Sequence, residues 1–213
     1  MPGGSGAAGA VLSARGTRLN KKGRETRRQV LREAVLCLSE GTPESVSANA
    51  IAQRAGVTWG TIQHQFGDVD GLWAALLDFV AGHADLRTIA TPDHPDIADR
   101  VEAVIDMLWG FLDLPGAAAI YQLRLSLPHQ AAQLEESYPQ TARAIAHWDV
   151  EWTDLCERCF RGLGLPADRL MRVRHFLPGA LRGLYNERNL STYTDSHEAR
   201  RGLMDALSAY LSS

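Results

Sequence analysis

Residues 47–66 read SANAIAQRAGVTWGTIQHQF, and this stretch decides which fold the sequence can form. Ser47 and Thr58 are residue types that cap helices, so each is expected to begin a short helix. At Ala55–Gly56–Val57 the small residue and the glycine permit a tight turn between the two helices. The stretch therefore predicts two short helices joined by a sharp turn.

The second of these helices has a buried and an exposed face. Ile62 and Phe66 are one helical turn apart and mark the buried face. A helix of this length fits the major groove of DNA, and its first residues meet base edges there. Glutamine can pair with adenine through two hydrogen bonds, and threonine hydroxyls suit phosphates. The residues that we expect on the outward face are Trp59, Gly60, Gln63 and His64.

Residues 51–66, IAQRAGVTWGTIQHQF, resemble the pattern IAxxAGVSxGTLYxYF of the TetR family of transcriptional regulators. The resemblance covers about 50 residues, from the first expected helix into the fourth. The rest of the chain is similar only in length and helical layout. The resemblance implies a homodimeric repressor, occasionally an activator, with three N-terminal helices that bind double-stranded DNA. It also implies a C-terminal domain that binds a small-molecule effector and forms the dimer.

The resemblance also implies roles for single residues. Thr58 matches the Ser or Thr that begins the recognition helix, and Gly60 and Thr61 match a Gly-Thr pair that approaches the DNA backbone. Trp59 and His64 fall at variable positions that face the bases. Gln63 and Gln65 stand where aromatic residues are usual. The expected DNA contacts in this stretch are Ser47, Thr58, Trp59, Gly60, Thr61, Gln63, His64 and Gln65.

One departure from the family pattern concerns the start of the fourth helix. The family commonly has a lysine there that donates to a phosphate, whereas this chain has Val69, flanked by Asp68 and Asp70. We expect the missing cation and the added repulsion to weaken binding to DNA. Basic residues before the motif can offset the loss, because each neutralised phosphate releases about 0.9 counterion. The cations expected to do so are Lys21, Lys22, Arg24 and Arg27.

The charge distribution supports this expectation. Between Arg15 and Arg28 there are seven Lys or Arg residues and one acidic residue, although the whole chain has a net charge of −3. A basic front and an acidic body suit a protein whose front meets a polyanion, but a solvated, disordered basic tail would give the same pattern. Residues 1–23 hold few large apolar groups, so we expect a flexible basic arm there.

Helical periodicity continues through the rest of the chain, and the sequence shows no convincing strand. The expected fold is all-α with about nine helices. No apolar run reaches about 18 residues and no secretory signal is recognisable, so we expect no membrane span and a cytoplasmic location. Three cysteines form no disulfide framework, which suits a reducing compartment. The expected division is an arm at 1–23, a helix–turn–helix DNA-binding domain at 24–68, and a ligand-binding and dimerisation domain at 69–213.

Large aromatic side chains in the C-terminal part are candidates for a ligand cavity. Such a cavity needs a mostly apolar lining with a few polar groups, and an aromatic lining suits a lipophilic or aromatic compound. An aromatic stripe at helical spacing also arises from ordinary core packing, and this alternative stays open. The candidate ligand-binding residues are Trp109, Tyr121, Trp148, Trp152 and Phe176.

Cys156 and Cys159 lie three residues apart on one apolar helical face. Core packing, a redox sensor and a metal site are the three interpretations. Redox motifs of this spacing usually lie at a helix N-terminus beside a βαβ unit, and a zinc site would need further ligands. Core packing is therefore favoured, with a redox-sensing regulator as the alternative. We expect no metal and no cofactor.

Small residues near the end of the chain are typical of a helix–helix interface. Such an interface between two subunits would make a four-helix contact and would place two recognition helices about 34–36 Å apart, which predicts a palindromic operator. Packing within one chain is the alternative. The expected interface residues are Gly179, Ala180, Gly183, Leu184, Leu203, Leu207 and Tyr210.

We do not expect an enzyme, because the sequence holds no nucleophile elbow, P-loop, HExxH or dinucleotide-binding pattern. A protein-interaction module is a further alternative, which predicts no operator binding at physiological salt.

Overall fold

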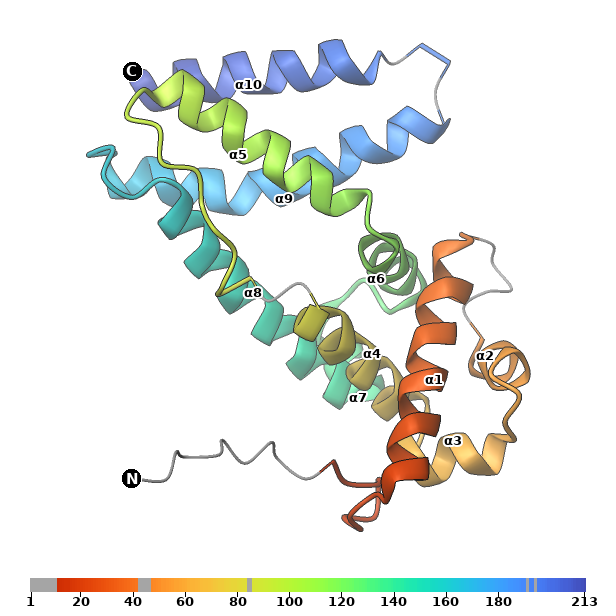
Figure 1. Ribbon diagram of the computed structural model, residues 1–213. Coiled ribbons are helices and arrows are strands. Elements are labelled where there is room, and N and C mark those ends of the chain that lie inside the picture. The colour runs from red at the N-terminus through yellow and green to blue at the C-terminus, as the bar shows by residue number, and fades with distance from the viewer. Residues whose placement is uncertain (1–10, 42–46, 84–85, 191, 194) are drawn as a thin grey trace, which may run out of the picture. The chain divides into compact units, whose positions relative to one another are not determined.

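The structure is a computed structural model that describes residues 11–41, 47–83, 86–190, 192–193 and 195–213. The described residues form ten helices, so the all-α expectation is confirmed (Figure 1). Their order is α1(Lys21–Ser39), α2(Ala48–Arg54), α3(Trp59–Phe66), α4(Val69–His83), α5(Ile97–Leu112), α6(Pro115–Ser126), α7(Ala131–Ser137), α8(Pro139–Cys159), α9(Ala167–Leu190) and α10(Ser196–Ser212).

The sequence did not indicate α7, which is the helix beyond the nine expected. This helix has seven residues, and none of them is buried, so it lacks the apolar stripe that reveals longer helices. No single described helix is both long and apolar enough to cross a membrane.

The chain forms two compact units. Unit 1 contains Met1–Val80 and Ala118–Ala144, and unit 2 contains Ala81–Ala117 and Ile145–Ser213. These compact units divide the chain at other positions than the expected parts at 1–23, 24–68 and 69–213, which describe functions and stay a prediction. The N-terminal helices share a unit with most of α6 and the start of α8, because contacts distant in sequence join these segments.

In unit 1, α1 begins at Lys21, three residues before the expected start. The side chain of Asn20 accepts a hydrogen bond from the backbone N–H of Gly23, which caps the helix. Val30, Ala34 and Leu38 form a buried stripe along α1. The stripe packs on α2, so the first two helices form a common core.

Residues 11–20 were expected to be a flexible arm, but the structure shows a closed turn there. The backbone N–H of Leu19 donates to the carbonyl of Val11, and the N–H of Ser13 donates to Thr17. Leu19 and Ser13 are buried. The expected arm at residues 1–10 lies outside the described residues. The flexible-arm expectation therefore does not hold for residues 11–20, because Leu19 buries its side chain and local hydrogen bonds close the turn.

The turn between α2 and α3 follows the sequence expectation. The hydroxyl of Ser47 accepts from the N–H of Ala50, and Thr58 accepts from Thr61. Gly56 has a φ of 66°, a left-handed conformation that side chains disfavour. The side-chain caps at Ser47 and Thr58 and the left-handed backbone at Gly56 thus fix the residue at which α3 begins.

The first turn of α4 brings two acidic residues into structural roles. Asp68 Oδ1 accepts from the N–H of Gly71 at 2.8 Å. Asp70 is 7% exposed, and its carboxylate accepts from the N–H groups of Gln140 and Thr141 at the start of α8. Asp70 therefore stabilises the N-terminus of another helix. The charge of Asp70 is thus bonded inside unit 1, and the expected repulsion of DNA stays a prediction.

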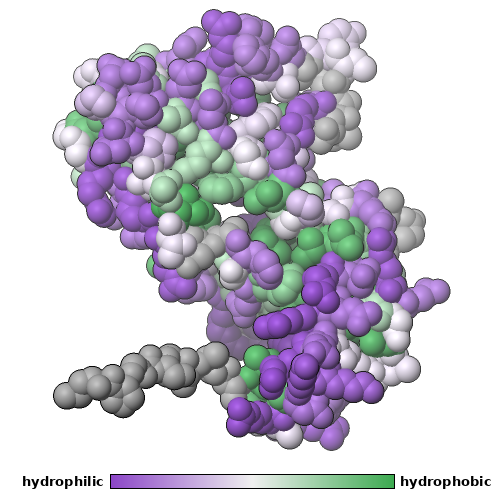
Figure 2. All heavy atoms as spheres, in the orientation of Figure 1, coloured by the Kyte–Doolittle hydropathy of each residue, from purple (hydrophilic) through white to green (hydrophobic). Residues whose placement is uncertain are grey.

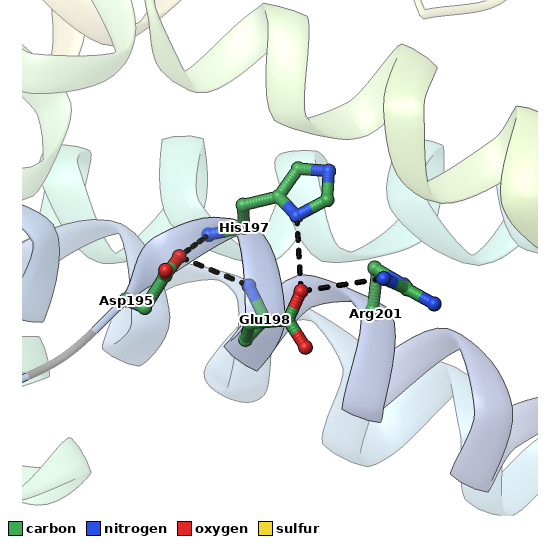
Figure 3. Close-up of polar contacts among 4 residues, drawn as sticks. All are labelled: Asp195, His197, Glu198 and Arg201. Carbon is green, nitrogen blue, oxygen red and sulfur yellow. Dashed lines mark hydrogen bonds and ion pairs between the residues drawn. The ribbon is translucent and has the colours of Figure 1, made fainter.

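Unit 2 encloses an apolar core built by α5, α8, α9 and α10. Val101, Ile105, Leu177 and Leu207 are among its most buried members. Asp195 caps α10, because its side chain accepts from the backbone N–H groups of His197 and Glu198 in the first turn (Figure 3). Glu198 then contacts both His197 and Arg201 on the same helix, as Figure 3 shows.

Candidate nucleic-acid interface

The helix α3 presents a polar face to solvent. Gln63, His64 and Gly60 are exposed, whereas Ile62 and Phe66 are buried on the opposite side. Thr58 is exposed and Thr61 half-buried, and their hydroxyl oxygens are 3.2 Å apart, within hydrogen-bonding distance. The outward face holds amide, imidazole and hydroxyl groups, which can bond to base edges and phosphates.

Trp59 is less exposed than the sequence indicated. It is the first residue of α3 and is half-buried. Together with Val69 and Trp73 of α4, it lines a hollow within unit 1. The expectation of an outward-facing Trp59 therefore holds only in part.

Gln65 belongs to the buried face, contrary to its expected role as a DNA contact. It is 4% exposed, and its Nε2 donates to the carbonyl of Gly23 in α1 at 3.2 Å. Its Oε1 has no hydrogen-bond partner among the described residues. The physical reason is its position three residues after Ile62, which turns it toward α1 rather than toward solvent.

Two of the four expected arginine and lysine contacts are engaged within unit 1. Arg24 donates to the carbonyl of Leu19 at 2.9 Å. Arg27 donates to the carbonyl of Gln65, and its guanidinium lies 4.3 Å from the centre of the Phe66 ring. Burial lowers the pKa of Arg27, and Asp78 opposes that shift. Both arginines hold α1 against neighbouring segments and so support α3 indirectly.

The exposed cations of unit 1 differ from the expected set. Lys21 and Lys22 are exposed as expected. The backbone N–H of Ala14 donates to the carbonyl of His64 at 3.3 Å, which ties the N-terminal turn to α3. Sequence reasoning missed Arg15 and Arg18 as ordered, exposed cations of this turn, because the arm was expected to be flexible.

The positive charge of Arg54 is already paired with acidic side chains of the same unit. Its guanidinium contacts the carboxylates of Glu33 and Glu40.

In Figure 2 the surface over α1 and α3 is mainly hydrophilic. A polar and locally basic surface of this kind suits a polyanionic partner.

The five expected ligand-binding aromatics do not form one described site. Trp109 is 7% exposed and packs edge-on against Tyr185, with ring centres 5.7 Å apart. Trp148 and Trp152 pack against the same core, and the indole of Trp152 donates to the carbonyl of Arg174. The other two are separate from this group, since Phe176 is 41% exposed and Tyr121 belongs to unit 1.

The two cysteines of α8 are part of the core of unit 2. Cys156 and Cys159 are 2% and 1% exposed. Burial raises the pKa of Cys156 to about 12 and that of Cys159 to about 11, so both thiols are protonated near neutral pH. The thiolate is the reactive form, so core packing is the interpretation that these values favour. The described residues contain no cluster of side chains suited to a metal ion.

The expected interface residues of α9 and α10 divide between surface and core. Gly179 and Gly183 are exposed, whereas Ala180, Leu184, Leu203 and Tyr210 are half-buried. Leu207 is 1% exposed and belongs to the core of unit 2, so it is not available to a second chain. Its position on α10 turns it toward α5 and α9. Ala206, which the sequence also placed on this face of α10, is exposed, and the exposed small residues that sequence reasoning missed are Gly202 and Ala209.

Comparison with known proteins identifies the fold. No protein-family model matches the chain, and no curated protein matches its sequence. A solved structure of a TetR-family transcriptional regulator from Cytophaga hutchinsonii matches 91% of this chain and 98% of its own, with a TM-score of 0.58 and 14% identity. NalD, the secondary repressor of the MexAB-OprM multidrug efflux pump in Pseudomonas aeruginosa, matches 89% and 98%, with a TM-score of 0.61 and 18% identity.

A third solved structure, the multidrug binding protein EbrR complexed with imidazole, matches 92% of this chain and 97% of its own, with a TM-score of 0.57 and 20% identity. The chain therefore has the fold of the TetR family of transcriptional regulators. The fold that the motif in residues 51–66 implied is confirmed.

Proposed function

We propose that this protein is a transcriptional regulator of the TetR family, most simply a repressor. It binds a palindromic operator as a homodimer through α3 and is released from DNA by a small molecule. The observation that carries the proposal is the capped helix α3, which buries Ile62 and Phe66 and leaves Gln63 and His64 exposed. A short helix with an outward face of hydrogen-bonding groups is suited to the major groove.

Contacts from α1 support this role by fixing the position of α3. Arg27 and Gln65 both bridge the two helices, through the Arg27 bond to the Gln65 carbonyl and the Gln65 bond to Gly23. A reading helix needs a rigid support, because base contacts lose their energy when the donor and acceptor are misplaced. Lys21 and Lys22 lie exposed at the start of α1 and are available to phosphates.

The dimer part of the proposal is supported by small exposed residues on two helices that pack together. Gly179 and Gly183 are four residues apart on α9, and a Cβ added at either would meet no described atom within 4 Å. Gly202, Ala206 and Ala209 follow the same helical spacing on α10. Small side chains allow the backbones of two helices to approach closely, which a two-fold contact between copies requires.

A ligand can release the DNA only if it binds better to an arrangement that does not fit the operator. We infer that α4 carries this change, because it begins beside α3 and Asp70 in its first turn is bonded to the start of α8. A coupling of about 1–3 kcal/mol would weaken operator binding by about 5- to 150-fold.

Selection of duplexes from a random DNA library by the full chain tests the proposal. We expect enrichment of one palindrome whose half-sites are about one helical turn apart. The variant Gln63→Ala with His64→Ala should bind the selected duplex more weakly by about 30-fold or more, because it removes two base contacts from each α3 and each contact contributes about 1–3 kcal/mol. Gln133→Ala, an exposed glutamine of α7, is the matched control and should bind like the parent chain. No enrichment of any duplex would favour a protein-interaction module.

A further inference from the structure

A hollow of about 490 Å³ lies within unit 1 and includes the first residue of α3 in its lining. Its walls come from the start of α2, the start of α3, the first turns of α4 and the segments at the end of α6 and before α8. Small-molecule sites have volumes of about 300–1,000 Å³. The hollow is thus of ligand size, and it lies among the elements that hold α3.

Aromatic and aliphatic side chains form part of the lining. Trp73 is 4% exposed, and Trp59 and Tyr138 are half-buried. Val69 and Leu127 add aliphatic surface. Aromatic side chains prefer offset-stacked or edge-to-face contacts with other rings, so this lining suits a flat ring system.

The polar groups of the lining are neutral. The hydroxyl of Ser126 donates to the carbonyl of Leu123 at 2.7 Å, which leaves its oxygen free to accept. The hydroxyl of Ser47 accepts from Ala50, which leaves its proton free to donate. Asn49 adds an exposed amide that can do both. Among the described residues of the lining none carries a formal charge, so the hollow offers no counter-charge to an ion.

We propose that this hollow binds a small, uncharged, flat aromatic molecule that carries one or two hydrogen-bonding groups. The proposal rests on the proposed function, because it assigns the effector site of the regulator to the DNA-reading unit. A molecule bound here contacts Trp59, the first residue of α3, together with Ser47 at the cap of α2 and Trp73 of α4. Because the lining includes the first residue of α3 and the cap of α2, a bound molecule favours one placement of α3, and it opposes operator binding if that placement does not fit the operator.

Binding is tested with N-phenyl-1-naphthylamine, an uncharged aromatic probe whose emission rises in apolar surroundings. The full chain is titrated with the probe, and one saturable site per chain is expected. Ser126→Trp places a large ring in the hollow from α6 and should weaken probe binding by about tenfold or more, which corresponds to about 1.4 kcal/mol. The neighbour Leu125 is 52% exposed and outside the lining, so Leu125→Trp is the matched control and should bind the probe like the parent chain.

A second variant that fills the hollow with a large side chain keeps the test valid if Ser126→Trp does not fold. Asn49→Trp enters the hollow from α2, and it should also weaken probe binding. Helical circular dichroism and thermal unfolding identify the variants that keep the fold. Unchanged probe affinity in a folded filling variant would overturn the proposal, because the probe would then be bound elsewhere.

A second measurement separates this proposal from the proposed function. The selected duplex is titrated with the parent chain in saturating probe, and a loss of affinity of about 5- to 150-fold is expected. At the same probe concentration the Ser126→Trp variant, which binds the probe more weakly, should lose less DNA affinity than the parent chain. If the probe binds in the hollow but leaves DNA affinity unchanged, the assignment as an effector site is overturned. If no duplex can be selected at all, the proposed function fails, and probe binding alone still decides whether the hollow is a ligand site.

Discussion

The carboxylate of Asp70 accepts a hydrogen bond from the backbone N–H of Thr141 at 2.8 Å, across 71 residues of sequence. Its second oxygen accepts from Gln140 at 2.9 Å, and the hydroxyl of Thr141 donates back to the carbonyl of Asp70 at 3.2 Å. An acid in the first turn of α4 therefore caps α8. The bonds join α4, which follows α3, to the start of α8 within unit 1.

Replacing Asp70 with alanine should destabilise the protein. The N–H groups of Gln140 and Thr141 would lose their partners in a buried place, which costs about 1–3 kcal/mol. For a chain of this size, that loss lowers the melting temperature by about 2–4 °C for each kcal/mol. Thermal and urea unfolding measure the change. Asp205 is exposed on α10, and Asp205→Ala is the control that should unfold like the parent chain. Equal unfolding of both variants would contradict the capping role.

Gln65→Met should change the free energy of unfolding by no more than about 1 kcal/mol, because it removes a buried oxygen that has no partner among the described residues but also the hydrogen bond to the Gly23 carbonyl. The same variant should lose little affinity for the selected duplex, since Gln65 lies on the buried face of α3 and Arg27 still bonds to the backbone carbonyl at this position. Urea unfolding and a DNA titration test both parts. A large loss of DNA affinity in a stable Gln65→Met chain would restore Gln65 to the reading surface.

Arg15 and Arg18 should contribute to DNA affinity through phosphates. If each neutralises one phosphate, changing both to glutamine in the two chains of the proposed dimer reduces the slope of log affinity against log salt by about 3.6. The measurement is a salt series with the selected duplex. Arg143→Gln with Arg161→Gln removes the same charge from exposed positions outside the candidate surface and should leave the slope unchanged. Point substitutions are preferable to removal of residues 1–23, because that deletion also removes the Asn20 cap of α1.

Cys156 and Cys159 should make the protein less stable at high pH. Their pKa values of about 12 and about 11 in the folded chain lie above the ordinary thiol value of 9.0, so the unfolded chain loses these protons first. Where the unfolded state binds fewer protons, stability falls as pH rises, here from about pH 9 through the folded pKa values of about 11 and about 12. Urea unfolding of the parent chain should show a steeper loss over this range than Cys156→Ala with Cys159→Ala. Parallel pH profiles would show that the thiols titrate normally.

Ala206→Glu should disrupt the proposed dimer. Ala206 is exposed on α10 between Gly202 and Ala209, and a two-fold contact would bring two added carboxylates into one interface. Sedimentation velocity should show a shift from dimer to monomer. Ala146→Glu adds the same charge at an exposed position of α8 and should leave the dimer intact. A chain that is monomeric before any substitution would contradict the dimer proposal directly.

Local chemistry in the sequence predicted part of this molecule well. Ser47 and Thr58 cap the helices that they were expected to cap, because a cap depends on residues only three positions away. Ile62 and Phe66 are buried for a similar reason, since helical spacing defines one face.

Contacts between distant residues could not be predicted in the same way. The role of Asp70 depends on Thr141, and the burial of Gln65 depends on Gly23. Periodicity assigned Leu207 correctly to a helical face, but it could not decide whether that face meets the same chain or a second copy. The five aromatic candidates for a ligand cavity do not form one site for a related reason. An aromatic stripe predicts that a helical face is buried, but it does not tell whether a ligand or another helix covers that face.

The most direct test of the central claim is a second DNA selection with Gln63→Arg. Glutamine in the major groove pairs with adenine, whereas arginine pairs with guanine. If Gln63 reads a base, the selected palindrome should change from adenine to guanine at one position in each half-site and nowhere else. The symmetric change would establish both the reading helix and the dimer. A selected sequence identical to that of the parent chain, bound with altered affinity, would contradict the account.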